Sequence, residues 1–405
     1  MAVNLTAKTA KELPVIDGIQ IYVGQAGIKK EGKNDLTLML LSPSANVAGV
    51  FTQNRFCAAP VTVCKKHLAE NQGIRAIVVN TGNANAGTGQ RGIDDALNVC
   101  TAVAAHIQCK PEQVLPLSTG VILEPLPATK IIHALPKVKP VHWDIAASAI
   151  MTTDTVPKAA TRQIKIDNKV ISVTGIAKGA GMIRPNMATM LSFVATDANI
   201  ASDLLNKWTK EIADNSFNRI TVDGDTSTND SFLIIATGKS GLPEISNDND
   251  PAAASVKAAI TETALELAKA IVRDGEGATK FITIQIDQAR SVEEARKVGY
   301  SIAHSPLVKT AFFASDANLG RLLCAIGNSG INDLDTAKVR MFLDSVLVVE
   351  NGGRAELYQE EDGARVMAKP EITVRVELNR GEQSVVLYTC DLSHDYVSIN
   401  ADYRS

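Results

Sequence analysis

Thr189 is the residue whose surroundings point most directly to covalent chemistry. It follows Ala188 in KGAGMIRPNMATML, a segment that runs from Lys178 to Leu191 and holds two glycines and a proline before the threonine. A threonine hydroxyl attacks a carbonyl only when a base activates it, and the nearest base is a free α-amino group on the same residue. That amine exists only if the Ala188–Thr189 peptide bond has been cut. Taken alone, the segment fits a self-cleaving proenzyme, and it also fits an ordinary loop before a strand.

Cleavage before Thr189 would leave pieces of 188 and 217 residues. The new α-amine would have a pKa of about 7.7–8.0, so it could act as a general base at neutral pH without a histidine. The same hydroxyl could first attack the carbonyl of Ala188 in an N→O acyl shift that releases the new terminus. The nearby glycine and proline residues would help to hold that strained backbone.

Acyl transfer also requires donors for the negative charge that develops on the carbonyl oxygen. Thr119 and Gly120, within LSTGVI at 117–122, offer a hydroxyl group and a backbone N–H that glycine leaves accessible. The letters STG alone favour an ordinary turn between the apolar runs VLPL and VIL. The sequence alone leaves both interpretations open.

Other segments suggest chemistry that their spacing does not support. Asp223 and Asp225, in DGDTS, resemble the nucleophile strand of haloacid-dehalogenase-type phosphatases, but that motif normally opens its chain. A turn held by Asp and Asn side chains fits better. The segment 80–92, NTGNANAGTGQRG, lacks the ending of a P-loop and the glycine order of a dinucleotide fold. No pair of the six histidines has metal-ligand spacing, so we expect no structural zinc site.

Size and composition indicate an ordinary globular protein with more than one subdomain. Its 405 residues exceed the roughly 250–300 at which a single core stops growing. A net charge of -3 without long basic runs argues against nucleic acid as a partner. No apolar run spans a membrane and no secretory segment opens the chain, so we expect a cytoplasmic protein without a membrane partner. The six cysteines form no CxxC pair and are expected to be buried, reduced thiols.

Short β-branched strands alternate with alanine-rich helices, which predicts a layered α/β protein. Asp167 and Asn168 form the expected turn of a hairpin over 163–173, and Ser202 the expected N-cap of a helix through Ile212. Residues 244–251 read as a loop. Further strands are expected at 74–80, 189–196 and 281–286, and further helices at 93–107, 256–271 and 292–303.

The chain resembles the ornithine acetyltransferases, also called glutamate N-acetyltransferases, of arginine biosynthesis. The resemblance begins at KGAGMIRPNMATML and extends over essentially the whole chain. The other matching segments are NTGNANA at 80, LSTGVI at 117, MTTDT at 151, FNRITVDGDTSTNDS at 217, RDGEGATKF at 273, SPLVKTA at 305 and the terminal DYVSINADYRS.

The family resemblance implies a layered sandwich of β-sheets and helices, of the aminopeptidase/ornithine acetyltransferase type, with a smaller C-terminal α/β domain. We expect structural domains at 1–280 and 281–405. The resemblance also implies self-cleavage between Ala188 and Thr189. The products would be an α chain, 1–188, and a β chain, 189–405, assembled as two copies of each.

The resemblance further implies a ping-pong reaction without a metal or an organic cofactor. Thr189 would take the acetyl group from N-acetylornithine, release ornithine and pass the acetyl group to glutamate; acetyl-CoA as a second donor stays open. Thr119 and Gly120 would form the oxyanion hole. Lys178 and Glu276 would supply the opposite charges that the substrate requires, although charged side chains are usually surface groups. The implied substrate contacts are Thr152, Lys178, Thr189, Glu276, Asn400 and Ser405.

One segment departs from the family pattern. Residues 316–321 read DANLGR where the family commonly has a DPNWGR-like string, which predicts altered local packing without loss of activity. Three other functions compete with the acetyltransferase. They are an N-terminal-threonine aminopeptidase or amidohydrolase of related fold, a magnesium-dependent phosphatase using Asp223 and Asp225, and a non-catalytic amino-acid-binding protein.

Overall fold

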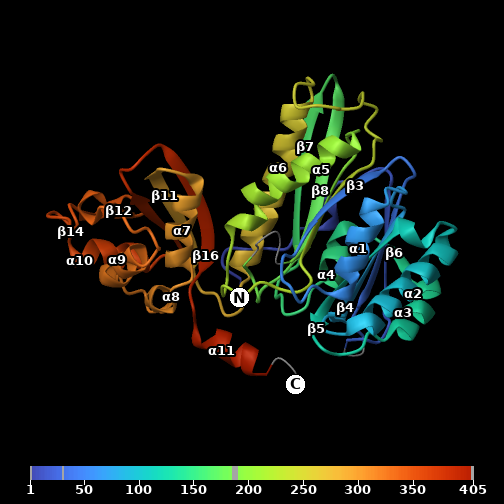
Figure 1. Cartoon of the computed structure of the whole chain (residues 1–405), viewed down its shortest axis with the longest axis horizontal. Helices are drawn as coiled ribbons and strands as arrows, with labels where there is room; N and C mark the ends of the chain where they lie inside the picture. Colours follow the sequence, from blue (N-terminus) through green and yellow to red (C-terminus); the bar gives the residue numbers. More distant parts are fainter. Residues whose placement is uncertain (1, 30–31, 185–189, 403–405) are drawn as a thin grey trace. The chain divides into compact units, whose positions relative to one another are not determined.

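The computed structural model describes residues 2–29, 32–184 and 190–402, which form two compact units (Figure 1). The large unit comprises Thr6–Asn218 and Asp225–Ile271. The small unit comprises Met1–Leu5, Arg219–Gly224 and Val272–Ser405. Each unit combines segments that are distant in sequence, whereas the expected domains 1–280 and 281–405 follow sequence order and stay a prediction.

Two five-stranded sheets form the centre of the large unit. The first has the order β5-β4-β2-β1-β6; β4 and β5 pair in parallel, and its other neighbouring strands pair antiparallel. The second has the order β3-β10-β9-β8-β7; β9 and β10 pair in parallel, and its other neighbouring strands pair antiparallel. The strands of the first sheet are β1 (Ile19–Gly24), β2 (Leu36–Leu41), β4 (Ala76–Asn83), β5 (Val114–Val121) and β6 (Lys139–Val141). Those of the second are β3 (Asn46–Phe51), β7 (Lys158–Ile166), β8 (Lys169–Lys178), β9 (Leu191–Thr196) and β10 (Ser231–Ala236).

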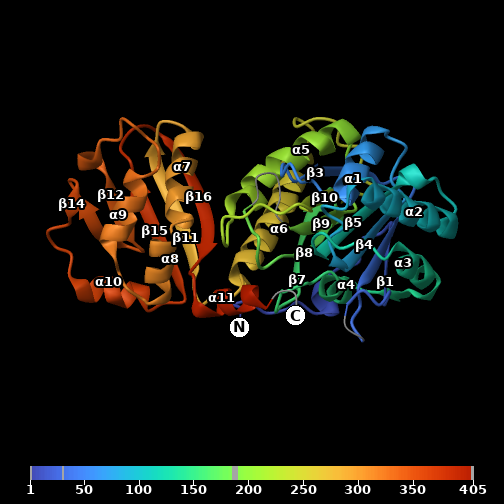
Figure 2. The ribbon, with the colours of Figure 1, turned by 60° about the horizontal axis from the view of Figure 1, so that its bottom comes forward.

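The two sheets share one hydrophobic core. Ile77 of β4 and Leu117 of β5 belong to it together with Phe193 of β9 and Leu233 of β10. Helices α2 (Gly89–Ile107) and α3 (Ala128–Ala134) pack on the opposite face of the first sheet. Helices α5 (Ser202–Asn215) and α6 (Ala253–Arg273) lie along the second sheet (Figure 2). Helices α1 (Ala59–Ala69) and α4 (Trp143–Ala149) add further apolar side chains to the shared core. This layering confirms the predicted fold class.

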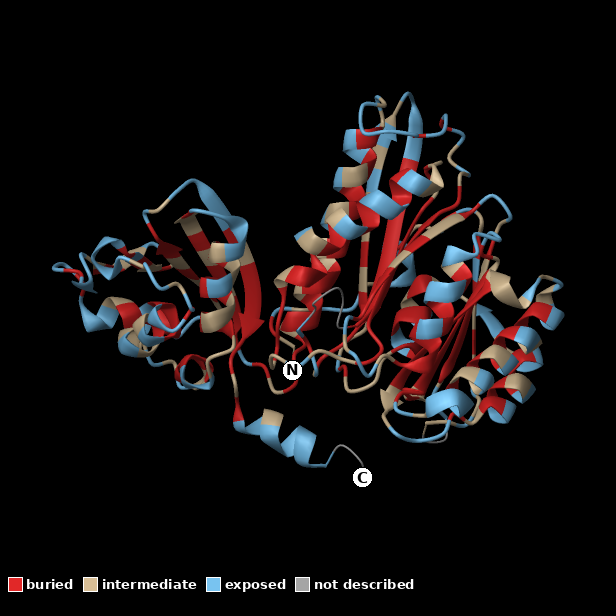
Figure 3. Cartoon of the chain, in the orientation of Figure 1, coloured by how far each residue is buried: buried red, intermediate tan, exposed pale blue. Residues whose placement is uncertain are grey.

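The small unit contains a six-stranded mixed sheet with the order β14-β13-β12-β15-β11-β16. Helix α7 (Val292–Ala303) packs on its strands β11 and β16, and α11 (His394–Ala401) has no buried residue (Figure 3). The strands are β11 (Phe281–Ala289), β12 (Arg340–Leu343), β13 (Val346–Glu350), β14 (Gly353–Arg354), β15 (Glu371–Glu377) and β16 (Gln383–Cys390). The other helices are α8 (Pro306–Phe313), α9 (Leu319–Gly327) and α10 (Glu360–Met367). Short 3₁₀ helices of the chain lie at Ala10–Glu12, Pro111–Gln113, Leu135–Lys137, Phe217–Arg219 and Thr336–Lys338.

Several predicted elements are confirmed. Asp167 and Asn168 have φ angles of +48° and +63° and join β7 to β8 as the expected hairpin turn. Helix α7 has the predicted bounds because Ser291 caps it by accepting the N–H of Glu294. At DANLGR the side chain of Asn318 likewise accepts the N–H of Arg321 and begins α9.

Three expectations are wrong in detail. Ser202 is the first helical residue of α5 and Ala201 is its N-cap, so no side chain caps that helix. The segment 118–120 lies inside β5 and does not form a turn, because Thr119 and Gly120 still pair with β4. Among the cysteines, Cys324 is exposed. Within the described residues no helix is long and apolar enough to cross a membrane.

Candidate active site

Gly120 lies at the end of β5, where the pairing with β4 becomes irregular. Its φ of +136° belongs to a region that L-residues rarely adopt. A Cβ atom at this position would lie 2.3 Å from the carbonyl carbon of Gly82 and 2.5 Å from the backbone nitrogen of Asn83. These neighbours are backbone atoms, so no change of rotamer relieves the clash. The close contact between β4 and β5 therefore requires glycine.

Thr119 and Lys178 come from different sheets and meet in the large unit. Lys178 is the last residue of β8, and its Nζ lies 3.3 Å from Oγ1 of Thr119. The two residues are only 9% and 8% exposed. An ammonium group can only donate, so the hydroxyl oxygen accepts and keeps its own hydrogen for a third group. The pair therefore forms a buried, positively charged site that can donate hydrogen bonds.

Asp154 connects the loop that carries Thr152 to the end of β8. Its Oδ2 accepts the N–H of Thr152 at 2.9 Å, and its Oδ1 accepts the N–H of Gly179 at 2.6 Å. Lys158 donates to the same Oδ1 at 2.6 Å, and neither side chain of this ion pair is exposed. Asp154 thus holds Thr152 and the residue after Lys178 in one arrangement.

The pKa values of two buried aspartates of the large unit are shifted in opposite directions. Burial alone would raise the pKa of Asp154, but Lys158, Lys178 and the N–H of Gly179 outweigh it and hold the pKa well below its usual range. Burial raises the pKa of Asp230 well above its usual range, despite hydrogen bonds with Ser227 and the charge of Lys178. The partners of Asp154 therefore favour its ionised form, whereas burial favours the neutral form of Asp230.

Asp230 directly precedes β10. Within the described residues its Oδ2 has no hydrogen-bond partner. The next residue, Ser231, donates its N–H to the carbonyl of Met190 at 2.8 Å. The Asp230 carboxyl thus adjoins the strand pair β9–β10, of which β9 begins at Leu191.

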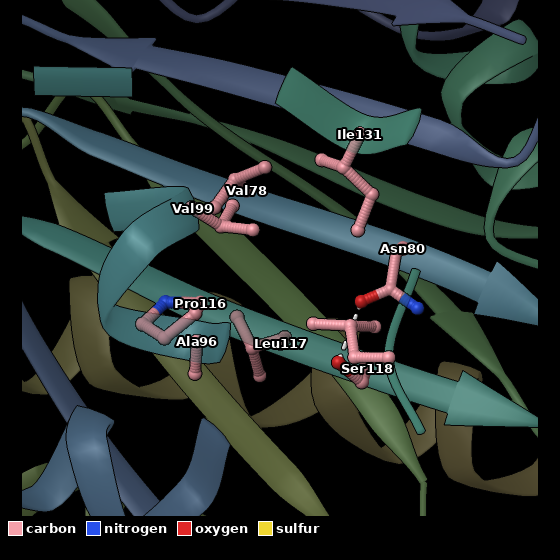
Figure 4. A pocket seen from close by; sticks show the side chains of 9 residues that line it. Val78, Asn80, Ala96, Val99, Pro116, Leu117, Ser118 and Ile131 are labelled. Carbon is pink, nitrogen blue, oxygen red and sulfur yellow. Dashed lines mark hydrogen bonds between the residues drawn. The ribbon is translucent and has the colours of Figure 1, made fainter. Parts of the chain in front are cut away.

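A network of amide side chains supports the strand that carries Thr119. Oδ1 of Asn80 accepts the hydroxyl of Ser118 at 2.6 Å, and Nδ2 of Asn80 donates to the carbonyl of Asn83 at 2.9 Å (Figure 4). Nδ2 of Asn229 donates to the carbonyls of Ala84 and Ser118, at 2.6 and 2.9 Å. The motif NTGNANA therefore helps to position β4 and β5.

The cavity of Figure 4 lies beside this network, between α2, α3 and strands β4 and β5. Its volume of about 10 Å³ admits about one water molecule. It is too small for an amino acid, so it belongs to the packing behind the candidate site. Its lining residues are Val78, Asn80, Ala96, Val99, Pro116, Leu117, Ser118, Leu126 and Ile131.

Glu276 and Asn400 meet in the small unit. Nδ2 of Asn400, on α11, donates to Oε2 of Glu276 at 2.8 Å, and Glu276 is only 7% exposed. Ser393, before α11, donates to the carbonyl of Gly277 at 2.6 Å. A Cβ at Gly277 would lie 2.5 Å from the backbone nitrogen of Tyr396. The C-terminal helix is therefore fixed against the turn that carries Glu276.

The structure groups the predicted site residues within each unit. Thr119, Gly120, Thr152 and Lys178 lie together in the large unit, and Glu276 with Asn400 lies in the small unit; Ala188, Thr189 and Ser405 are outside the described residues. No cluster of three metal-ligating side chains occurs within the described residues. Motif analysis missed Asp154 and Asn229, although both lie in segments that matched the family, MTTDT and TSTNDS.

Comparison with known proteins identifies the family. The sequence model of the ArgJ family matches residues 20–405. The arginine biosynthesis bifunctional proteins ArgJ of Neisseria meningitidis serogroup A and of Neisseria gonorrhoeae (strain ATCC 700825 / FA 1090) are each 63% identical over 406 residues, which is 100% of this chain and 100% of theirs. The chain belongs to the ArgJ family.

A solved ArgJ structure shares the fold as well as the sequence. The arginine biosynthesis bifunctional protein ArgJ from Bacillus halodurans is 37% identical and has a TM-score of 0.50. The match covers 52% of this chain and 97% of that chain. ArgJ membership confirms the resemblance predicted from the sequence. It also confirms an acetyltransferase of arginine biosynthesis over the aminopeptidase alternative.

Proposed function

We propose that this chain cleaves itself before Thr189 and then moves an acetyl group from N-acetylornithine to glutamate. The observation that carries the proposal is family membership over the whole chain, at 63% identity to bifunctional arginine biosynthesis proteins. The buried group of Thr119, Gly120 and Lys178 supports it, because acyl transfer needs such donors.

The length of the Bacillus halodurans chain supports cleavage. A match that covers 97% of that chain spans only 52% of this one. The solved ArgJ chain is therefore about half as long, as expected for one product of a chain divided near its middle. A cut before Thr189 gives pieces of 188 and 217 residues, and the second is slightly more than half of 405.

Self-cleavage requires no outside reagent except water. Oγ of Thr189 attacks the carbonyl carbon of Ala188, the C–N bond breaks, and the acyl group moves from nitrogen to oxygen. Water then hydrolyses the ester, which leaves a carboxylate on Ala188 and a free α-amine on Thr189. That amine is the base that the transfer reaction needs.

Acetyl transfer follows in two half-reactions. The α-amine of Thr189 takes the hydroxyl proton while Oγ attacks the acetyl carbon of N-acetylornithine. The hydroxyl of Thr119 and the N–H of Gly120 donate to the oxyanion, and the proton passes to the departing nitrogen of ornithine. The α-amine of glutamate then attacks the acetyl ester, and N-acetylglutamate leaves as Oγ regains its proton.

The charged residues fit a substrate with opposite charges at its ends. Lys178 binds the carboxylate next to the reacting nitrogen, with Thr152 beside it on the loop that Asp154 holds. Glu276 binds the distal ammonium of ornithine, with Asn400 donating to its carboxylate. Ser405 is a further substrate contact. We include acetyl-CoA as a second donor and an assembly of two α and two β chains in this proposal.

The central test uses purified wild-type protein and the variant Thr189→Ala. The wild type should give two bands near half the full mass on a denaturing gel and should carry an acetyl adduct on Thr189 after incubation with N-acetylornithine. Thr189→Ala should remain one band and transfer nothing. An intact wild-type chain that still transfers acetyl groups would contradict the mechanism.

Two controls address the competing functions. Rapid turnover of the acetyl adduct without glutamate would favour an amidohydrolase, since water would then resolve the intermediate. Full activity in excess chelator would dismiss a magnesium-dependent phosphatase. Formation of N-acetylglutamate from acetyl-CoA, compared with its formation from N-acetylornithine, tests the second donor.

A further inference from the structure

Lys29 lies on a segment that Asp35 folds over the first sheet. The Asp35 carboxylate accepts hydrogen bonds from three backbone N–H groups of this segment, those of Ala26 at 2.5 Å, Ile28 at 2.6 Å and Lys29 at 3.0 Å. Asp35 is itself 1% exposed, so the anchor is part of the core. The position of Lys29 is therefore fixed by the fold.

The side chain of Lys29 adjoins the candidate site at two points. Its Cγ lies 3.2 Å from the place where a Cβ of Gly82 would be, and Gly82 is the backbone neighbour of Gly120. Its Nζ donates to the carbonyl of Met151 at 2.6 Å, one residue before Thr152. The ammonium thus lies between the strand that carries the oxyanion donors and the loop that carries a predicted substrate contact.

The charge of Lys29 is poorly compensated. Burial lowers its pKa to about 8, and repulsion from Lys178 acts in the same direction, against the attraction of Asp35 and Asp154. Within the described residues no carboxylate lies at ion-pair distance from its Nζ, because Asp35 is occupied by backbone N–H groups and Asp154 by Lys158. An anion bound beside both lysines would relieve their repulsion.

We propose that Lys29 is a second carboxylate-binding residue of the site and serves the dicarboxylate acceptor, glutamate. The inference rests on the proposed function, in which the donor, N-acetylornithine, has one carboxylate and a distal ammonium, and glutamate has two carboxylates. Lys178 takes the carboxylate that both substrates share. Lys29 takes the second carboxylate of glutamate and repels the ammonium of the donor, so it favours the acceptor.

The test measures ping-pong kinetics for the cleaved wild type, Lys29→Met and Lys29→Arg. Methionine keeps much of the length and removes the charge. Lys29→Met should raise the KM for glutamate about tenfold to a hundredfold, the scale of a lost charge-assisted hydrogen bond. It should leave the KM for N-acetylornithine unchanged or lower it, because the repulsion of the donor ammonium is removed. Lys29→Arg should recover part of the glutamate affinity because it restores the charge.

Lys137→Met is the control, because Lys137 is an exposed lysine of the large unit outside this segment. It should change neither KM. Equal rises in both KM values for Lys29→Met, or no rise for glutamate, would overturn the role of Lys29. The two bands on a denaturing gel and an unchanged melting temperature show that each variant has folded and cleaved.

The two proposals fail separately. The wild type and Thr189→Ala alone decide whether the chain transfers acetyl groups through a threonine ester. If that transfer occurs and Lys29→Met still binds glutamate normally, only the assignment of Lys29 is lost. If the wild type transfers nothing, the proposed function fails before the variants are compared.

Discussion

At the scale of single residues, the large unit contains two buried aspartates whose pKa values are shifted in opposite directions. Asp154 has a lysine and two backbone N–H groups around it, so its charge is compensated. Within the described residues Asp230 has hydrogen bonds with Ser227 but no ion pair, so burial prevails and raises its pKa. Charge therefore follows from the local partners and not from burial alone.

Replacement of each aspartate by asparagine should change the unfolding free energy by different amounts. Asp154→Asn leaves Lys158 buried without its counter-charge and should cost about 3–5 kcal/mol of unfolding free energy. Asp230→Asn keeps a neutral group where burial favours the neutral carboxyl, and it should change that free energy by less than about 1 kcal/mol. Chemical denaturation at pH 7 measures both. Similar losses in the two variants would contradict the assignment.

The same pair makes a prediction about pH. The folded state lowers the pKa of Asp154, so its stabilisation is complete above the ordinary value of about 3.9 and is lost as pH falls through the folded pKa. The folded state raises the pKa of Asp230, so stability falls as pH rises from about 3.9 towards that higher value. Asp230→Asn should therefore flatten the decline of unfolding free energy on the neutral side. An unchanged slope of unfolding free energy against pH would argue against a raised pKa of Asp230.

Gly120→Ala should impair both folding and catalysis. The new Cβ would meet backbone atoms at 2.3 and 2.5 Å in addition to the strain at a φ of +136°. Gly73→Ala is the control, since its φ is +72° but no atom lies within 4 Å of the added Cβ. We expect about 1 kcal/mol of destabilisation at Gly73 and clearly more at Gly120, with kcat reduced at least tenfold only at Gly120. Denaturation and kcat measurements together distinguish strain from the clash.

At the scale of elements, local signals predicted what local physics decides. Helix α7, whose cap comes from Ser291, and the Asp-Asn turn of the hairpin each depend on residues close in sequence. The segment STG was misjudged because its alternatives depend on a distant partner. Pairing with β4, which lies about forty residues earlier, makes it a strand.

The residues of the candidate site likewise divide into those predicted from the sequence and those recognised only in the structure. Family resemblance supplied the predicted contacts, because motifs preserve positions. It did not supply the supporting contacts of Lys29, Asp154 or Asn229, since each connects segments far apart in sequence. A carboxylate or amide in a loop has no sequence pattern that names its partner. Those roles become visible only in the folded chain.

Asn229 tests whether the amide network positions the oxyanion donors. Asn229→Ala would leave the carbonyls of Ala84 and Ser118 without this donor and should cost about 2–4 kcal/mol of unfolding free energy. Because Ser118 precedes Thr119, kcat should fall more than KM rises. Asn249→Ala, in an exposed turn, is the control and should behave as wild type. A stable Asn229→Ala enzyme with full kcat would remove the positioning role.

At the scale of the whole molecule, the proposed cut divides a sheet that takes strands from both pieces. Strands β3, β7 and β8 precede Thr189, and β9 and β10 follow it. The order β3-β10-β9-β8-β7 places the two later strands between earlier ones. Strand β9 pairs with β8 from Thr196 opposite Val173 to Leu191 opposite Lys178, and β10 pairs with β3 over its whole length. The shared core also takes side chains from both pieces.

The two pieces of the cleaved protein should therefore remain together until the large unit unfolds. Separation would break the hydrogen bonds on both outer sides of the β9–β10 pair and expose the core between the sheets. Size-exclusion chromatography at neutral pH should give one peak that contains both bands on a denaturing gel. The bands should separate only at the denaturant concentration that unfolds the large unit. Residues 189–405 expressed alone should aggregate, because β9 and β10 would present unpaired edges. Elution of either piece alone without denaturant would show that the interleaved sheet does not hold them.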